Sequence, residues 1–191
     1  MKFKKIWDFI WHDDSWLSWF VNVILAFILV KFIIYPGLAF LLGTSHPVVA
    51  VVSCSMEHNT NLGECNLDHL DFDNWWNLQD NLYSQLQISK EEFSDYRFSN
   101  GFNKGDLMIL TRVKEIKNGD VIVFYGSSNE PIIHRVVLSN EVYQTKGDNN
   151  PGSRNDEMKI TNDRIIGKAL IRIPYLGWLK VWFNDLLLSI F

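Results

Sequence analysis

The sequence has few cysteines and no excess of basic residues. Only two of its 191 residues are cysteines, Cys54 and Cys65, which is too few for a disulfide-built scaffold. They do not form a Cys-x-x-Cys metal motif, and the sequence leaves open a single bridge or two free thiols. The formal net charge of −4 and the lack of a basic stripe argue against nucleic-acid binding.

Long apolar runs are confined to the two ends of the chain. Residues 16–42, WLSWFVNVILAFILVKFIIYPGLAFLL, carry one charge, Lys31, and a membrane-spanning helix needs about 20 such residues. A cleavable signal peptide would have a shorter apolar core, so the sequence predicts a retained transmembrane anchor. We expect the helix to end near Pro36, with the following residues in the interface. The alternative is a helix kinked at Pro36 that continues to Leu42.

The flanks of this run predict its direction in the membrane. Three lysines precede it, and no comparable cluster follows it directly. By the positive-inside rule, residues 1–15 are then cytoplasmic and the chain after residue 42 is extracytoplasmic, in a single-pass cell-membrane protein. Four tryptophans are typical of an aromatic belt at the membrane surface. These residues are Lys2, Lys4 and Lys5, and Trp7, Trp11, Trp16 and Trp19.

The C-terminal residues 173–191 are also mostly apolar, and Lys180 and Asp185 are the charged residues that interrupt them. On a helix, their leucines and aromatic residues would gather on one side. The segment therefore predicts a membrane-associated helix, which either lies in the interface or forms a second span.

Strand signals dominate the middle of the chain, which we expect to form an extracytoplasmic β domain over residues 43–172. Six β-branched or alternating runs are separated by turn-forming residues. Short strands at this spacing favour a mainly β, antiparallel barrel or sandwich. The runs are Pro47–Val52, Asp106–Val113, Asp120–Tyr125, Ile132–Leu138, Glu141–Gly147 and Ile165–Ile173.

One segment differs from this β pattern. Residues 57–103 are acidic and rich in Asn, Asp and Trp, and they suggest an inserted small helical subdomain. Residues 78–96 predict one or two short helices, with Ser89 as the N-cap of the run that starts at Lys90. Because it is acidic, this subdomain should remain in solvent and away from anionic lipid.

Three elements have the residue types needed for catalysis, although each alone has a simpler explanation. Ser55, in Ser-Cys-Ser-Met, follows the first strand, but loop serines are common. His134 alternates with Ile132 and Val136 on one strand face, where a histidine is more often a core residue. As a catalyst, its neutral imidazole would accept a serine proton near neutral pH.

The third element is the loop 146–156, which offers two carboxylates, Asp148 and Asp156, to orient an imidazole. Its Asp, Asn, Gly and Pro residues are equally typical of plain turns. A calcium loop is a weaker interpretation, because the spacing does not match an EF-hand and no closing glutamate is present. We therefore expect no metal and no cofactor.

The order of these elements resembles type I signal peptidases, specifically the archaeal and endoplasmic-reticulum branch that uses a Ser-His pair. The matching stretches cover most of the chain from Pro47 onward, apart from the insert, which follows the Ser-Met motif and is larger than this family's usual link. Cys54 stands where the family usually has glycine. The stretches are Ser53–Met56, Lys104–Leu107, Gly119–Ile122, Ile133–Val136, Lys146–Asn150 and Ile173–Gly177.

This resemblance implies a site and a reaction. Ser55 would be the nucleophile and His134 its base, with the Ser55 N–H and the Ser53 hydroxyl stabilising the oxyanion. Asp156 would be the third triad member and Asp148 a supporting carboxylate, although these two roles could be exchanged.

The implied activity is a membrane-bound serine endopeptidase that removes signal peptides from secretory preproteins after small residues. Its partners would be preproteins and the lipid bilayer, and the insert would cover the cleft, contact the translocation machinery or recognise preprotein. The alternative is a non-catalytic, membrane-anchored binding subunit that holds a partner through the acidic insert.

Overall fold

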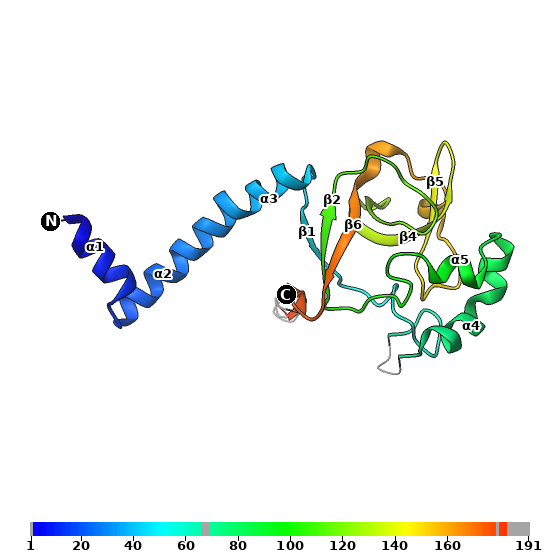
Figure 1. Cartoon of the computed structure of the whole chain (residues 1–191), viewed down its shortest axis with the longest axis horizontal. Coiled ribbons are helices and arrows are strands. Elements are labelled where there is room, and N and C mark those ends of the chain that lie inside the picture. Colours follow the sequence, from blue (N-terminus) through cyan, green and yellow to red (C-terminus); the bar gives the residue numbers. More distant parts are fainter. Residues whose placement is uncertain (1, 66–68, 179, 183–191) are drawn as a thin grey trace. The chain divides into compact units, whose positions relative to one another are not determined.

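The computed structural model describes residues 2–65, 69–178 and 180–182. The chain divides into two compact units, residues 1–43 and residues 44–191. The first unit contains only helices and the second contains the sheet, and each is described separately below (Figure 1).

The N-terminal unit begins with α1 (Lys2–Trp11), followed by α2 (Trp16–Leu29). Ser15 is the N-cap of α2, and its side chain accepts a hydrogen bond from the Ser18 N–H. The Ser18 hydroxyl in turn donates to the Phe9 carbonyl at 2.6 Å, and the Asn22 amide donates to the Ile10 carbonyl at 2.8 Å. Side chains of α2 therefore satisfy carbonyls at the end of α1, which a helix terminus otherwise leaves unpaired.

The apolar helix continues past Pro36, so the expectation that it ends there is wrong. A π-helical turn, η1 (Val30–Ile34), links α2 to α3 (Tyr35–Leu42), and the Tyr35 N–H donates to the Val30 carbonyl. In a regular helix, the proline ring would clash with the carbonyl four residues earlier, and the wider turn accommodates it. The resulting helix, Trp16–Leu42, is long and apolar enough to cross a membrane.

The second unit is built on one antiparallel sheet of six strands in the order β1-β2-β6-β3-β4-β5. This confirms the mainly β prediction and all six expected strands. Strands β3, β4 and β5 follow one another as neighbours, whereas β6 inserts between β2 and β3, so the C-terminal strand joins the two halves. The strands are β1 (Val48–Ala50), β2 (Leu107–Thr111), β3 (Val121–Tyr125), β4 (Pro131–Ser139), β5 (Tyr143–Lys146) and β6 (Ile165–Ile173).

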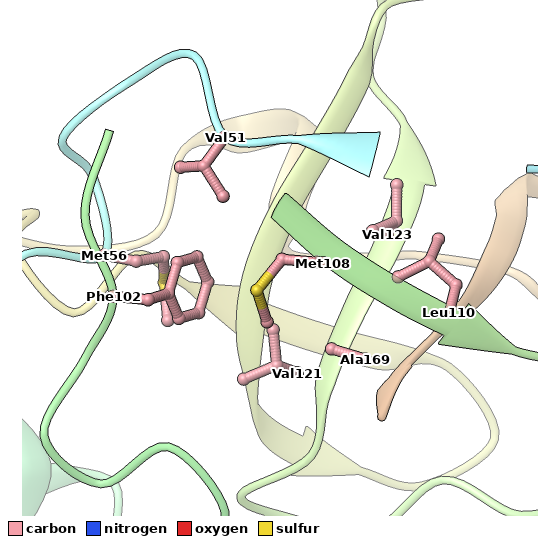
Figure 2. Packing of buried hydrophobic residues seen from close by; sticks show 8 residues of the cluster. All are labelled: Val51, Met56, Phe102, Met108, Leu110, Val121, Val123 and Ala169. Atoms are coloured by element: carbon pink, nitrogen blue, oxygen red, sulfur yellow. The ribbon is translucent and has the colours of Figure 1, made fainter. Parts of the chain in front are cut away.

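A core of buried side chains lies on this sheet beside the segment that carries Ser55 (Figure 2). Met56, next to Ser55, is fully buried there against Phe102 and side chains of β2 and β3. Burying a side chain of this size is worth about 1.5–3 kcal/mol, so the serine loop is anchored to the sheet by its neighbour. The core residues are Val51, Met56, Phe102, Met108, Leu110, Val121, Val123 and Ala169.

Residues 57–103, called the helical segment below, contain α4 (Phe72–Gln85) and α5 (Lys90–Ser94). Ser89 caps α5 by accepting from the Glu92 N–H, as predicted, but α4 begins six residues before the expected helical run at Leu78. The ends of the segment meet, because the Phe102 N–H donates to the Met56 carbonyl at 3.0 Å.

The helical segment packs on β4 through an aromatic cluster. Trp75, Trp76, Tyr83 and Phe93 are buried around Val137 of β4. Contacts between stacked and tilted aromatic rings stabilise the fold by more than the burial of their apolar area alone. The segment is therefore part of the folded core around β4.

The C-terminal expectation falls largely outside the described residues. Residues 174–177 form a turn after β6, and a helical stretch begins at Trp178. Val181 is buried and Trp182 is exposed. The structure thus describes only the start of the helix predicted over 173–191. The prediction for residues 183–191 lies outside the described residues.

Candidate active site

The Ser55 hydroxyl lies within hydrogen-bonding distance of His134. Its Oγ atom is 2.9 Å from Nε2 of the imidazole, although the two residues are 79 positions apart in the sequence. The Ser53 Oγ atom is 3.2 Å from the Ser55 Oγ atom. The structure therefore brings together three of the residues selected from the sequence, Ser53, Ser55 and His134.

His134 is held from its other side by a buried glutamate. Its Nδ1 atom is hydrogen-bonded to Oε1 of Glu157, a side chain that is 0% exposed. A carboxylate on Nδ1 selects the tautomer whose Nε2 carries no proton and faces the serine hydroxyl. This geometry allows His134 to accept a proton from Ser55.

Glu157 is fixed by further hydrogen bonds. Its Oε2 atom accepts from the Arg154 backbone N–H at 2.9 Å, and Oε1 accepts from the Thr145 hydroxyl at 3.3 Å. Burial alone would raise the pKa of Glu157, but the hydrogen bond and charge of His134 outweigh it and lower the pKa. The glutamate is therefore ionised at neutral pH and aimed at the imidazole.

Asp156, the expected third member of the triad, does not occupy that position. Its Oδ2 atom accepts from the Ser127 backbone N–H at 3.3 Å, and its Oδ1 atom lies 3.6 Å from Nε of Arg154. Asp156 and Glu157 are adjacent in a 3-10 helix, where successive side chains point about 120° apart. Only one of them can reach His134, and in this structure it is Glu157.

Asp148 binds Arg135, on the opposite face of β4 from His134. The guanidinium donates to both carboxylate oxygens, with Nε–Oδ1 at 2.9 Å and Nη2–Oδ2 at 2.7 Å, and both side chains are 0% exposed. Burial would raise the pKa of Asp148, but the charge of Arg135, the nearby His58, whose Nε2 atom lies 3.7 Å from Oδ2, and the hydrogen bonds from Arg135 lower it far below its usual range. Asp148 is thus a buried structural carboxylate that does not orient His134.

The two cysteines form a disulfide, Cys54–Cys65, beside the serine. The Asn149 side-chain amide donates to the Cys54 carbonyl at 3.1 Å and to the Glu64 carbonyl at 2.9 Å. These hydrogen bonds join the same two loop segments that the disulfide connects. The sequence left the pairing open, because only the fold brings residues 54 and 65 together.

Ser55 and His134 open into a cleft of about 820 Å³. One wall comes from residues 50–55, another from 128–134 and a third from 150–154, and Ala50, Val52 and Ile132 give it apolar patches. Such a mixture of apolar walls and a few polar groups is typical of binding sites. Among the described residues, no group of three or more His, Cys, Asp or Glu side chains is placed to hold a metal ion.

No family model matches the chain. It is, however, 32% identical over 98 residues to the human "Signal peptidase complex catalytic subunit SEC11C", across 44% of this chain and 51% of that protein. This chain is similar to signal peptidase catalytic subunits. The SEC11 subunits of Colletotrichum graminicola and Lachancea thermotolerans are also 32% identical, over 98 and 100 residues, with 57% and 59% of their lengths covered. The chain thus spans about half the length of the curated relatives that it matches, and the similarity supports an endoplasmic-reticulum-type signal peptidase family.

The residue that sequence reasoning missed is Glu157. The signal peptidase resemblance implies an aspartate in this role, and Asp156 is the only one near the expected spacing. The available signal was the adjacent pair Asp156-Glu157 at the end of the loop. Which of the two carboxylates turns inward depends on the local helix and on Thr145 and Arg154, which the sequence alone does not place.

Proposed function

We propose that this chain is a membrane-anchored serine endopeptidase that removes signal peptides from secreted preproteins. The observation that carries the proposal is the line of hydrogen bonds from Ser55 through His134 to Glu157, at the wall of an open cleft. The similarity to SEC11 subunits supports this substrate class.

In the proposed mechanism, Ser55 Oγ attacks the scissile carbonyl while its proton passes to Nε2 of His134. The Glu157 carboxylate stabilises the imidazolium that forms. His134 then gives this proton to the departing amine, and a water molecule, activated by the same imidazole, releases the acyl-enzyme. These steps require no metal and no cofactor.

The oxyanion would accept hydrogen bonds from the Ser55 backbone N–H and the Ser53 hydroxyl. The position of the Ser53 oxygen, 3.2 Å from the nucleophile, supports its part in this role. Removing one such donor typically costs about 10²–10³ in turnover. We expect the substrate to bind extended along β1, because this edge strand leads into the cleft through Ala50 and Val52.

The helix Trp16–Leu42 would anchor the enzyme, with residues 1–15 in the cytoplasm and the sheet on the opposite side. The Cys54–Cys65 disulfide supports this direction, since disulfides persist mainly in oxidising compartments. Enzyme and preprotein would then be confined to one membrane surface.

The test is cleavage of a model preprotein in detergent or lipid by wild type, Ser55→Ala and His134→Ala, with the cut site sequenced. Both substitutions should abolish cleavage, because each removes a group that takes part in every bond-making step. Circular dichroism and thermal unfolding control for folding.

Cleavage at the wild-type rate by either variant would refute the mechanism. A folded wild-type protein that cleaves no preprotein would instead favour the non-catalytic binding subunit.

A further inference from the structure

We propose that the helical segment positions the catalytic groups by holding the turn at residues 147–149, which lies against them. Gln79 and Tyr83 of α4 are its positioning residues. This inference rests on the proposed function. The described residues that line the cleft come from 50–55, 128–134 and 150–154, and none of them belongs to the helical segment.

The first link is the turn at residues 147–149, which lies directly against the reacting side chains. A Cβ atom built on Gly147 would lie 2.7 Å from the Ser55 carbonyl oxygen and 2.9 Å from His134 Nε2. The Asn149 backbone N–H donates to the Ser55 carbonyl at 2.8 Å. Any displacement of this turn therefore moves the backbone of Ser55 or presses on the imidazole.

The second link is α4, which holds the same turn from its other side. The Gln79 side-chain amide donates to the Asp148 carbonyl at 2.7 Å, and the Tyr83 hydroxyl donates to Asp148 Oδ1 at 3.2 Å. The Lys146 ammonium donates to Gln79 Oε1 at 3.0 Å and to the Gly147 carbonyl at 3.0 Å. Gln79 thus joins the residues on both sides of Gly147.

The third observation is burial. Gln79, Tyr83 and Asp148 are 0% exposed and Lys146 is 1% exposed, so these contacts are shielded from bulk solvent. A buried polar group left without its partner is costly, and a small displacement of a catalytic group can slow a reaction by up to about 10²-fold. The contacts of α4 are therefore placed to affect the rate of the chemical step.

The experiment is single-turnover cleavage of a model preprotein at increasing concentrations of enzyme in excess. Gln79→Met should lower the plateau rate constant roughly tenfold, because it removes the 2.7 Å hydrogen bond to the Asp148 carbonyl and one of the acceptors of buried Lys146. Tyr83→Phe keeps the ring and removes one hydroxyl, and we expect a loss of about threefold.

Two variants serve as matched controls, and both should keep the wild-type plateau. Gln85→Met makes the same replacement at an exposed position of α4, where the side chain contacts Asn81. Tyr96→Phe removes a hydroxyl that bonds to Glu92 within the helical segment.

The plateau rate constant distinguishes a variant with misplaced catalytic groups from a variant of which less is folded. A smaller folded fraction raises the enzyme concentration needed for half-saturation but leaves the plateau unchanged, whereas misplaced groups lower the plateau itself. Wild-type plateaus for both Gln79→Met and Tyr83→Phe would overturn the inference while the proposed function stands. Failure of the wild-type protein to cleave would refute the proposed function itself.

Discussion

Asp156 and Glu157 are adjacent carboxylates that contact different groups. Glu157 is hydrogen-bonded to His134, whereas Asp156 faces Ser127 and Arg154 at the edge of the same loop. This difference allows the roles of two neighbouring residues to be separated by substitutions that preserve shape.

We expect Glu157→Gln to lower kcat roughly 10²-fold or more, because a neutral amide neither selects the productive tautomer nor stabilises the imidazolium. Asp156→Asn, the matched control, should remain within about twofold of wild type. Steady-state cleavage of a model preprotein measures both. A loss in Asp156→Asn as large as that in Glu157→Gln would reverse the assignment.

Lys146 predicts a pH dependence of stability. Burial is the largest influence on its pKa and lowers it from 10.5 to about 8, against the attraction of Asp148. Between these values the unfolded chain holds a proton that the folded chain has released, so the free energy of unfolding should rise with pH. Below about pH 8 both states are protonated and the cost of burying the charge is fully present.

Comparison with Lys146→Met isolates this effect, because other groups, including Tyr83 with its raised pKa, titrate in both proteins. From pH 8 to 10.5, wild type should gain on the order of 2–3 kcal/mol relative to the variant. Denaturant unfolding at several pH values measures the difference. A difference that does not change with pH would show that Lys146 titrates normally.

At the scale of elements, the loop that carries Ser55 is closed by a covalent bond. The Cys54–Cys65 disulfide spans 11 residues, and Met56 on the same loop is buried in the core of Figure 2. The loop is therefore tied both to the helical segment and to the sheet.

Opening this disulfide should lower the free energy of unfolding by about 2–3 kcal/mol, since it releases a short loop in the unfolded chain. Thermal unfolding with and without a phosphine reductant tests this, and the double variant Cys54→Ser/Cys65→Ser provides the control. The reductant should lower the Tm of wild type to near that of the variant and leave the variant unchanged. An identical wild-type Tm under both conditions would contradict the prediction.

For the whole molecule, the proposed function predicts separate tasks for the two units. Residues 1–43 form one compact unit and residues 44–191 form the other, which contains Ser55, His134 and Glu157. Confinement of two partners to one surface raises their effective concentration without any new contact.

Removing residues 1–43 should therefore lower the cleavage of preprotein inserted in lipid vesicles by roughly 10²-fold or more. Hydrolysis of a short soluble peptide with the same cut site should stay within about threefold of the full chain. Equal losses on the two substrates would mean that the N-terminal unit supports the fold of the second unit.

Much of the architecture follows from local patterns in the sequence. The six strands were predictable because alternation, β-branched residues and turn residues act over a few positions. The Ser89 cap of α5 was predictable for the same reason. Helix α1 was not predicted. The prediction that the apolar helix ends near Pro36 was wrong, because η1 depends on backbone geometry that composition does not reveal.

The sequence by itself determined the strands, the apolar helix and the choice of Ser55 and His134 as candidates, since these depend on local pattern and on motifs that resemble a known family. Only the tertiary structure decided that Glu157 reaches His134, that Cys54 pairs with Cys65 and that α4 supports the turn at Gly147. Each of these depends on groups that are distant in the sequence or on which of two neighbours faces inward. Packing of the whole domain sets such contacts, and no single segment encodes them.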